Sequence, residues 1–376
     1  MTLRTRTLHL ARGLVLAFAG LGCASAVVAD QPGQPYDPPA GVYPLFPASP
    51  FLTRVPNPAT VNPQSAIWLA KLGNFSLGRF QFAADASGLG HDYGFPLYYN
   101  HAGANVPVKI HCTRHWGTCN VEGLTVYIDP HEVPQDNARA GQDSHLGLID
   151  QNVGDGYEYT FWQVGPASGE GSWPPSDGTL HISWGGRCLL SGNGFTNPSF
   201  TARPSACSGT ATSTPLSSGA IRVKDLLAAV QSGGTLPFAL AVGVKCSAHT
   251  FLPPFRGSDG HDPTCSPQGS RMYLAMHDAD VDATGAAPIV RAILRTIDED
   301  HYGMFVTDTN GGQDGVSLAT EADTTYTSWG APGPWLTQFV PEAQREGLPG
   351  AAAPYNGTYH ISLPLPGNVA GQMRFL

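Results

Sequence analysis

The chain has 376 residues, of which 13% are charged, and its formal net charge is −9 at pH 7. An acidic chain is repelled by the phosphates of nucleic acids and by anionic membranes, so we expect neither as a partner. The 45 glycines and 33 prolines together exceed a fifth of the chain. This composition indicates short strands joined by many turns and argues against a helical protein.

Residues 1–29 have the pattern of a secretory signal peptide. Basic residues precede a short apolar run, and small residues fit cleavage after Ala26 or Ala29. The apolar run is shorter than a membrane-spanning helix requires. We therefore expect a secreted protein, extracellular or periplasmic, with no membrane insertion.

Residues 30–60 are rich in proline and are predicted to form an extended leader. Phe46 and Phe51 indicate that its second half packs on the domain that follows. Residues 61–376 are predicted to form a single domain, because no clear linker divides them.

Short apolar runs alternate with Gly, Pro, Asn and Asp from Phe75 to Cys265, which is typical of strands and turns. Helices after most strands, which parallel βαβ units need, are absent from the pattern. The expected strands are 79–82, 96–99, 106–111, 124–128, 146–149, 157–163, 180–184 and 240–244.

Apolar residues at helical spacing predict two helices, over residues 223–230 and 288–298. The first ends at Gly233, and the second begins at Pro288 and has an apolar face suited to packing on a sheet. We therefore expect a mainly β protein: a jelly-roll-like β-sandwich with two or three peripheral helices.

Six cysteines remain after removal of the signal peptide, and an even number in an exported protein indicates disulfides. Because no Cys-x-x-Cys pair occurs, a metal cluster is the weaker interpretation. The cysteines fall into three close pairs, so we predict the bridges Cys112–Cys119, Cys188–Cys207 and Cys246–Cys265.

The residues best suited to catalysis lie around one predicted hairpin, residues 141–164. Asp143 and His145 are two positions apart, which places both side chains on one face of a strand. Glu158 lies among aromatic residues of the next strand, where burial would raise its pKa and suit it to act as a general acid. Asp308, at the end of a distant strand, is the fourth candidate. The alternatives are that Glu158 points away from the cleft and that Asp308 only caps a turn.

Substrate contacts are expected from the same hairpin and from two arginines. Glycoside hydrolysis needs two carboxyls roughly 5–10 Å apart. The second reaction to consider is the lyase cleavage of a uronate, with His145 as the base and a tyrosine as the acid. In that reaction an arginine would bind the carboxylate of the uronate. The predicted substrate-binding residues are Tyr157, Tyr159, Trp162, Arg222 and Arg271, and the other tryptophans suited to a carbohydrate groove are Trp116, Trp173 and Trp184.

The thirteen histidines raise the question of a metal ion. The closest groupings are His111 with His115, Asp143 with His145 and Asp259 with His261. The first pair needs a helix to converge, whereas its sequence favours a loop. The acidic residues at 278–282 lack the glycine and the terminal glutamate of a calcium loop. We therefore expect no metal ion at the site and no cofactor, and the sequence leaves open whether a structural ion is bound.

Several short motifs follow one another along the chain: Asp143-x-His145, Tyr157-Glu158, Gly209-x-Ala211, Gly219-x-Ile221-Arg222, Gly269-x-Arg271 and Tyr302-Gly303-Met304. Their order resembles that in a set of largely uncharacterised exported bacterial proteins, over about residues 45–330. The resemblance implies export and a β-rich fold. Phe238 stands where that set often has a histidine. At the level of the fold, the expected β-sandwich is also similar to polysaccharide-degrading enzymes.

We expect a carbohydrate-active enzyme that cleaves a polysaccharide or oligosaccharide, and we favour a glycoside hydrolase over a lyase. The alternative is a non-catalytic carbohydrate-binding or cell-surface β-sandwich protein. Two convergent carboxyls in a cleft would favour hydrolysis, whereas a flat aromatic face without them would favour binding. The sequence leaves the substrate and the oligomeric state open.

Overall fold

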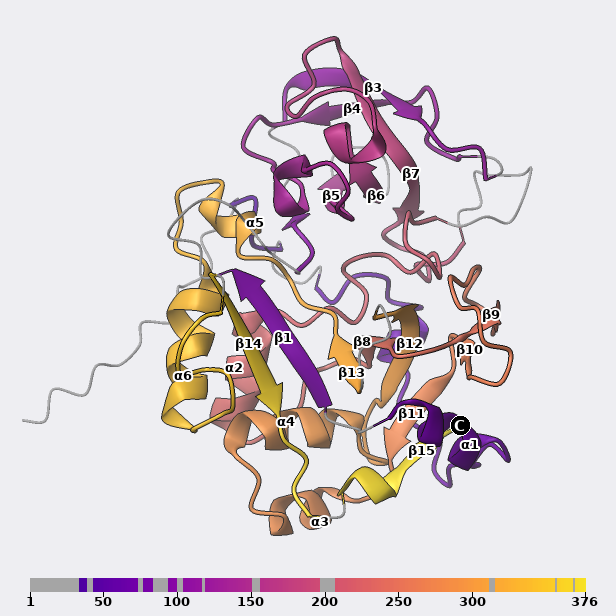
Figure 1. The fold of residues 1–376 in the computed structure, drawn as a ribbon, viewed down its shortest axis with the longest axis vertical. Coiled ribbons are helices and arrows are strands. Elements are labelled where there is room, and N and C mark those ends of the chain that lie inside the picture. Colours follow the sequence, from indigo (N-terminus) through magenta and orange to yellow (C-terminus); the bar gives the residue numbers. More distant parts are fainter. Residues whose placement is uncertain are drawn as a thin grey trace, which may run out of the picture.

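The chain is mainly β, with three sheets arranged in two parts (Figure 1). The computed structural model describes residues 34–38, 43–73, 77–83, 94–99, 104–116, 119–150, 156–196, 207–310, 315–355, 357–367 and 369–376. The predicted signal peptide lies outside the described residues.

The lower part of the molecule in Figure 1 is built on a seven-stranded sheet. In spatial order its strands are β14 (Thr358–Leu363), β1 (Leu77–Ala83), β13 (Val316–Leu318), β8 (Leu240–Val244), β12 (Met304–Thr309), β11 (Arg271–Leu274) and β15 (Met373–Phe375).

Helices cover one face of this sheet. Leu226 of α2 (Val223–Ser232) and Ile293 of α4 (Pro288–Ile297) share a core with Val242 and Val306 of the sheet. α4 begins at Pro288 and α2 ends at Gly233, which has a positive φ of 62°, as their sequences predict. The prediction that α4 packs on a sheet is therefore confirmed.

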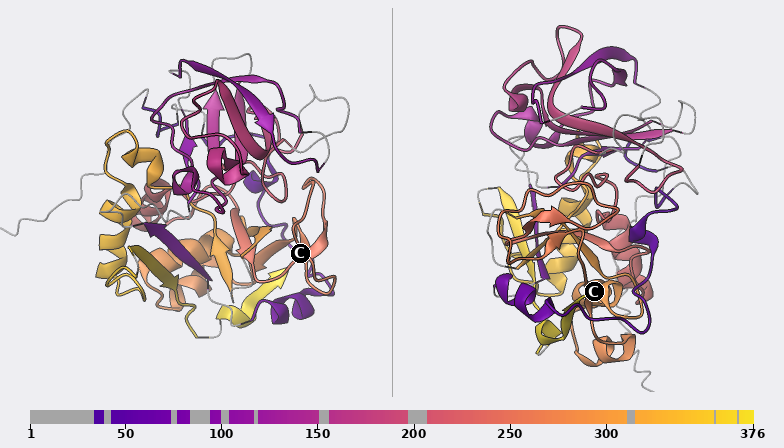
Figure 2. Two further views of the ribbon diagram at one scale, coloured as in Figure 1. Left: turned by 45° about the horizontal axis from the view of Figure 1, so that its top comes forward. Right: turned by 90° about the vertical axis from the view of Figure 1, so that its right-hand side faces the viewer.

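The upper part is built on a six-stranded sheet, whose strands are, in spatial order, β2 (Leu97–Tyr98), β5 (Leu146–Asp150), β6 (Tyr157–Val164), β7 (Thr179–Leu189), β3 (Val106–Cys112) and β4 (Thr125–Ile128). One face carries a core of its own that includes Leu148 and Phe161. On the other face, Ile149 packs with Leu216, which belongs to a loop that leads into the lower part. The turned views show the same division (Figure 2).

Shorter elements complete the fold. They are the paired strands β9 (Ala248–Phe251) and β10 (Pro267–Gln268), the helices α1 (Ser65–Lys71), α3 (Asp278–Ala283), α5 (Thr324–Thr327) and α6 (Val340–Arg345), and the single turns η1 (Pro50–Leu52), η3 (Gln135–Ala138), η4 (Gly165–Ser168), η5 (Trp335–Phe339) and η6 (Val369–Gln372).

The predicted strands are found close to their expected positions, and β5 pairs antiparallel with β6 as the central hairpin requires. The jelly roll is not confirmed. A jelly roll is made of antiparallel strands, whereas β8 with β12, β3 with β7, and β1 with β13 are parallel neighbours. Alternation along one strand indicates that a strand forms, but it does not reveal its neighbour.

All three predicted disulfides are confirmed: Cys112–Cys119, Cys188–Cys207 and Cys246–Cys265. The docking of the leader is also observed, because Phe46 and Phe51 are completely buried. Within the described ranges, no helix combines the length and the apolar character needed to cross a lipid bilayer.

Candidate functional site

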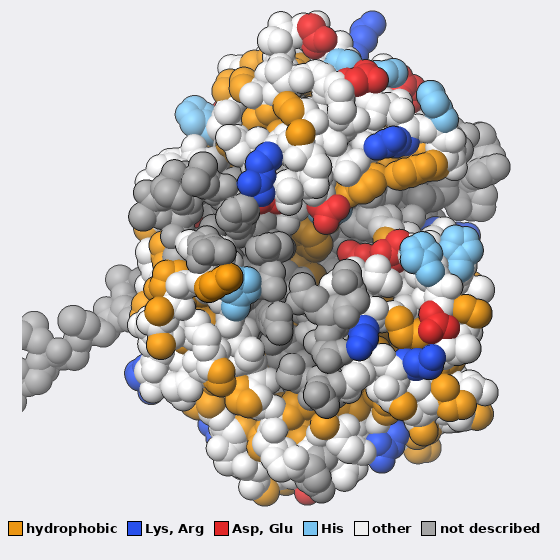
Figure 3. Space-filling model, viewed as in Figure 1, with side chains coloured by type: hydrophobic (Ala, Val, Ile, Leu, Met, Phe, Trp, Pro, Cys, Tyr) orange, Lys and Arg blue, Asp and Glu red, His pale blue; other side chains and the backbone are white. Residues whose placement is uncertain are grey.

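A hollow with a volume of about 350 Å³, here called the inter-sheet cavity, lies between the two larger sheets. Asp143 and His145 line it from the six-stranded side, and Gly243, Asp308 and Ser317 line it from β8, β12 and β13. Acidic side chains gather in the hollow between the two parts of the molecule (Figure 3). Three of the four predicted catalytic residues therefore meet in one place.

Asp308 reaches this cavity because of an irregularity in β12. Val306 pairs with Val242, but Asp308 pairs with Gly243, so β12 advances by two residues while β8 advances by one. Simple alternation would turn Asp308 toward the helices, with Val306. The extra residue, Thr307, is a β-bulge that turns the carboxyl of Asp308 toward the cavity instead.

Asp308 is paired with a second carboxyl, that of Asp259. Asp308 is a solvent-exposed residue that lines the hollow, and surrounding protein atoms partly desolvate its carboxyl. Burial, then the charge of Asp259 and a hydrogen bond shared with it, raise the pKa of Asp308 well above its usual range. The charge of Asp143 raises this pKa further. Asp259 is itself fixed by the hydroxyl of Thr309, which donates to its Oδ2 at 2.6 Å, and by the side-chain amide of Gln268.

Asp143 has different surroundings. Its side chain is exposed, and its Oδ1 accepts a hydrogen bond of 3.0 Å from Nε1 of Trp162. The ring of Trp162 lies 5.4 Å from that of Trp116, which lies 5.9 Å from that of Trp184. We call these three residues the tryptophan cluster. Trp116 is 62% exposed, so an aromatic surface accessible to solvent adjoins the carboxylate of Asp143.

His145 is almost completely buried at the cavity wall. Burial lowers its pKa, and the charge of Asp143 opposes that change only in part, so its ring is neutral at pH 7. Its Nδ1 makes no hydrogen bond within the described residues. The preceding residue, Ser144, has a positive φ of 42°, so the backbone enters β5 through a conformation that alternation does not anticipate.

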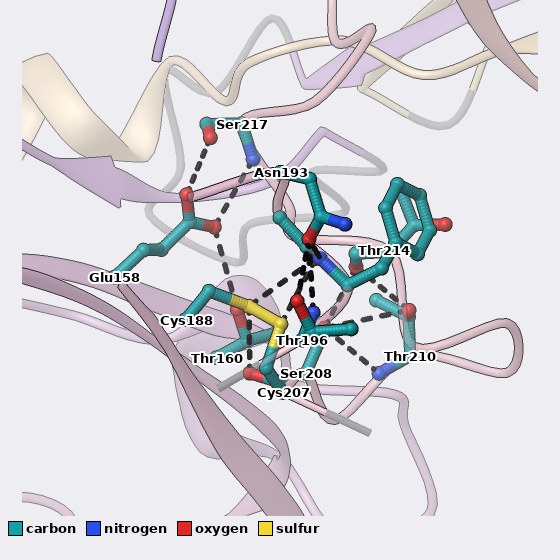
Figure 4. Close-up of a disulfide and its surroundings, with 12 residues drawn as sticks. Glu158, Thr160, Cys188, Asn193, Thr196, Cys207, Ser208, Thr210, Thr214 and Ser217 are labelled. Carbon is teal, nitrogen blue, oxygen red and sulfur yellow. Dashed lines mark hydrogen bonds between the residues drawn. A yellow bond between two sulfur atoms is a disulfide. The ribbon is translucent and has the colours of Figure 1, made fainter. Parts of the chain in front are cut away.

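Glu158 does not line the cavity. It is completely buried and accepts a hydrogen bond of 3.2 Å from the backbone N–H of Ser217 and one of 3.3 Å from the hydroxyl of Thr160. It also contacts the Ser217 hydroxyl (Figure 4). Burial raises the pKa of Glu158 to about 7, against the effect of these hydrogen bonds. The predicted rise in pKa is therefore present, but the carboxyl secures the loop that carries Leu216 and Ser218 into the cavity wall.

The predicted substrate-binding residues are divided between several places. Trp162 adjoins the cavity through Asp143, whereas Tyr157 and Tyr159 belong with the core on the opposite face of the sheet. Tyr157 and Tyr159 therefore do not meet the catalytic candidates, because they alternate with Glu158 along β6.

The two arginines predicted to bind substrate do not line the cavity and bind other parts of the protein instead. Arg222 is buried, forms ion pairs with Asp37 at 3.0 Å and Glu321 at 3.5 Å, and stacks on two tyrosines. Arg271 donates to the backbone carbonyls of Thr53 and Tyr302. Both guanidinium groups are thus already bound by protein atoms.

Sequence reasoning missed Asp259 as a partner of Asp308, as well as the cavity residues Gln135, Thr210 and Thr214. The sequence shows Asp259 only as a neighbour of His261, because its closeness to Asp308 is a property of the fold.

Comparisons of the chain with family models, with curated proteins and with solved structures found no match.

Proposed function

We propose that the chain is a secreted carbohydrate-active enzyme, a glycoside hydrolase whose reaction takes place in the inter-sheet cavity. The observation that supports it best is that two carboxyls from opposite sides of one cavity, those of Asp143 and Asp308, lie in contrasting surroundings. The raised pKa of Asp308 favours the protonated form of its carboxyl. Hydrolysis of a glycosidic bond needs one such acid and one carboxylate.

In this scheme Asp308 donates its proton to the glycosidic oxygen as the C–O bond breaks. Asp143 either removes a proton from the attacking water or attacks the sugar carbon itself, and the N–H of Trp162 orients its carboxylate. Asp259 is a positioning residue, because it acts through its hydrogen bond to Asp308.

The cavity favours an uncharged glycan over a uronate. None of the described residues that line the cavity is Lys or Arg, whereas a lyase needs a cation to neutralise the substrate carboxylate. The carboxylate of Asp143 would repel that of a uronate. The tryptophan cluster offers sugar rings an apolar face beside Asp143. Hydrolysis therefore remains preferred to the lyase reaction, for which His145 would be the base.

The test is a screen of the secreted protein against neutral polysaccharides, followed by substitution of each acid. Asp143→Asn and Asp308→Asn should each lower turnover by at least about a hundredfold, the scale of a lost acid–base group. Asp150→Asn, at the last residue of β5, is the matched control and should keep its activity. Full activity in a folded Asp308→Asn variant would refute the assignment.

A non-catalytic carbohydrate-binding protein is the second candidate, and the exposed tryptophan cluster favours it. It predicts that a glycan binds without being cleaved. Binding would then be lost in Trp116→Ala and unchanged in Asp308→Asn.

A further inference from the structure

Two histidines from adjacent strands of the six-stranded sheet face the same side. His111 of β3 and His181 of β7 are direct partners in the parallel register. Their neighbours Ile110 and Ile182 point into the core, so the histidines lie on the opposite face. The centroids of the two rings are 5.5 Å apart, and the rings are nearly perpendicular, at 86°.

A carboxylate from a tight loop joins the two rings. Oε2 of Glu170 lies 3.4 Å from Nδ1 of His181. The Ser168 hydroxyl holds the backbone of Glu170 at both ends, because it accepts from the N–H of Glu170 and donates to its carbonyl. Gly171, with a positive φ of 76°, packs so closely that an added Cβ would lie 2.6 Å from the His181 ring. The loop therefore fixes Glu170 against this histidine.

The separations suit a metal ion. One ligand atom from each of His111, His181 and Glu170 lies within 4.8 Å of the other two. In a tetrahedral site with metal–ligand bonds of about 2.0–2.2 Å, the ligand atoms are about 3.3–3.6 Å apart. The distance of 3.4 Å between Glu170 and His181 falls in this range.

Each histidine also has a second carboxylate on its other nitrogen. Oε1 of Glu122 lies 3.3 Å from Nδ1 of His111, and Oδ2 of Asp177 lies 3.4 Å from Nε2 of His181. These carboxylates are themselves fixed, because Glu122 accepts from the N–H of Cys112 and Asp177 from that of Thr179. Outer carboxylates of this kind orient metal-binding histidines and raise their basicity.

The same pairing identifies the nitrogens left for a ligand. Glu122 occupies Nδ1 of His111, so Nε2 remains. Asp177 occupies Nε2 of His181, and the remaining Nδ1 is buried and makes no hydrogen bond within the described residues.

We propose that His111, His181 and Glu170 form a binding site for a divalent transition metal, zinc in particular, with a solvent molecule as the fourth ligand. Two imidazoles and one carboxylate suit zinc better than calcium or magnesium, which prefer oxygen ligands. The site joins β3, β7 and the loop after η4 through a single ion. It is independent of the glycoside hydrolase proposal.

The experiment uses the full secreted chain, treated with a chelator and titrated with zinc chloride by calorimetry. One equivalent should bind. His111→Ala and His181→Ala should each weaken binding by more than about a hundredfold, and Glu122→Gln by about 10- to 100-fold, as for the loss of an outer partner. His131→Ala, a histidine that pairs with Asp129 elsewhere on the surface, is the matched control and should bind as the wild type does.

Absence of binding by the folded wild type would overturn the proposal, and so would unchanged binding in the His111 and His181 variants. Loss of zinc only in Asp298→Asn would instead place it at a second cluster, formed by Asp278, Asp298 and His301. If His181→Ala does not fold, the visible absorption spectrum of the wild type with bound Co²⁺ tests the proposed tetrahedral geometry instead. The tetrahedral site predicts strong visible absorption, and the weak absorption of octahedral Co²⁺ would refute it.

Discussion

Glu158 should make the stability of the protein depend on pH in a way that one substitution removes. Its pKa is about 7 in the folded chain, against 4.5 for a free glutamate. Between these values the unfolded chain releases the proton while the folded chain keeps it. The free energy of unfolding therefore falls as the pH rises from 4.5 to 7, and the contribution of Glu158 is constant outside this window.

The size of the effect follows from the two pKa values. At about 1.4 kcal/mol per pKa unit, a rise from 4.5 to 7 corresponds to about 3 kcal/mol. Glu158→Gln imitates the protonated acid, because its amide still accepts from the N–H of Ser217 and donates toward the Ser217 hydroxyl. Relative to the wild type, the variant should therefore become more stable by about 3 kcal/mol between pH 4.5 and pH 8.

Urea titrations of both proteins across this pH range, followed by tryptophan fluorescence, measure the difference. Glu321 also has a pKa raised to about 7 by burial, so the wild type alone would overstate the contribution of Glu158. The difference between wild type and variant isolates it. A difference that does not change with pH would refute the buried, proton-retaining state of Glu158.

Three further substitutions test the packing. Ile293→Ala, in the face of α4 that packs on the seven-stranded sheet, should lower the free energy of unfolding by about 2–5 kcal/mol in denaturant titrations, because it leaves a cavity; a loss below about half a kcal/mol would contradict the burial. Gly219→Ala should cost about 1–3 kcal/mol more than Gly285→Ala. Both glycines have positive φ, but an added Cβ would lie 2.5 Å from an aromatic ring at Gly219 and meet nothing within 4 Å at Gly285; equal melting temperatures would contradict this. Replacing Cys188 and Cys207 by alanine should cost about 2–5 kcal/mol, and reductant should then destabilise the variant less than the wild type.

Local pattern was enough to predict most strands, the two longer helices and the three disulfides. The alternation of apolar and polar residues predicts the strands at residues 146–149 and 157–163. These strands pair as a hairpin, which brings Asp143 close to Trp162. These features depend on residues near one another in sequence, where backbone geometry limits the choices.

The arrangement of the sheets and half of the site depend on contacts between distant segments. β8 and β12 are parallel neighbours although a long stretch of chain separates them, and no local pattern indicates that. Asp259, which lies between β9 and β10, and Asp308 of β12 also meet although they are far apart in the sequence. Glu158 shows the opposite case: its aromatic neighbours predicted a raised pKa correctly, but they could not indicate that Ser217 would cover it.

The bulge at Thr307 means that the inter-sheet cavity depends on the number of residues in β12 as well as on their identity. Deleting Thr307 would restore simple alternation and turn the carboxyl of Asp308 toward Ile293 and the other apolar side chains under the helices. A homologue with an aspartate at the aligned position, but one residue fewer before it, would therefore lack this acid. For transplanting the site into another scaffold, the insertion is as necessary as the aspartate, and no point substitution can replace it.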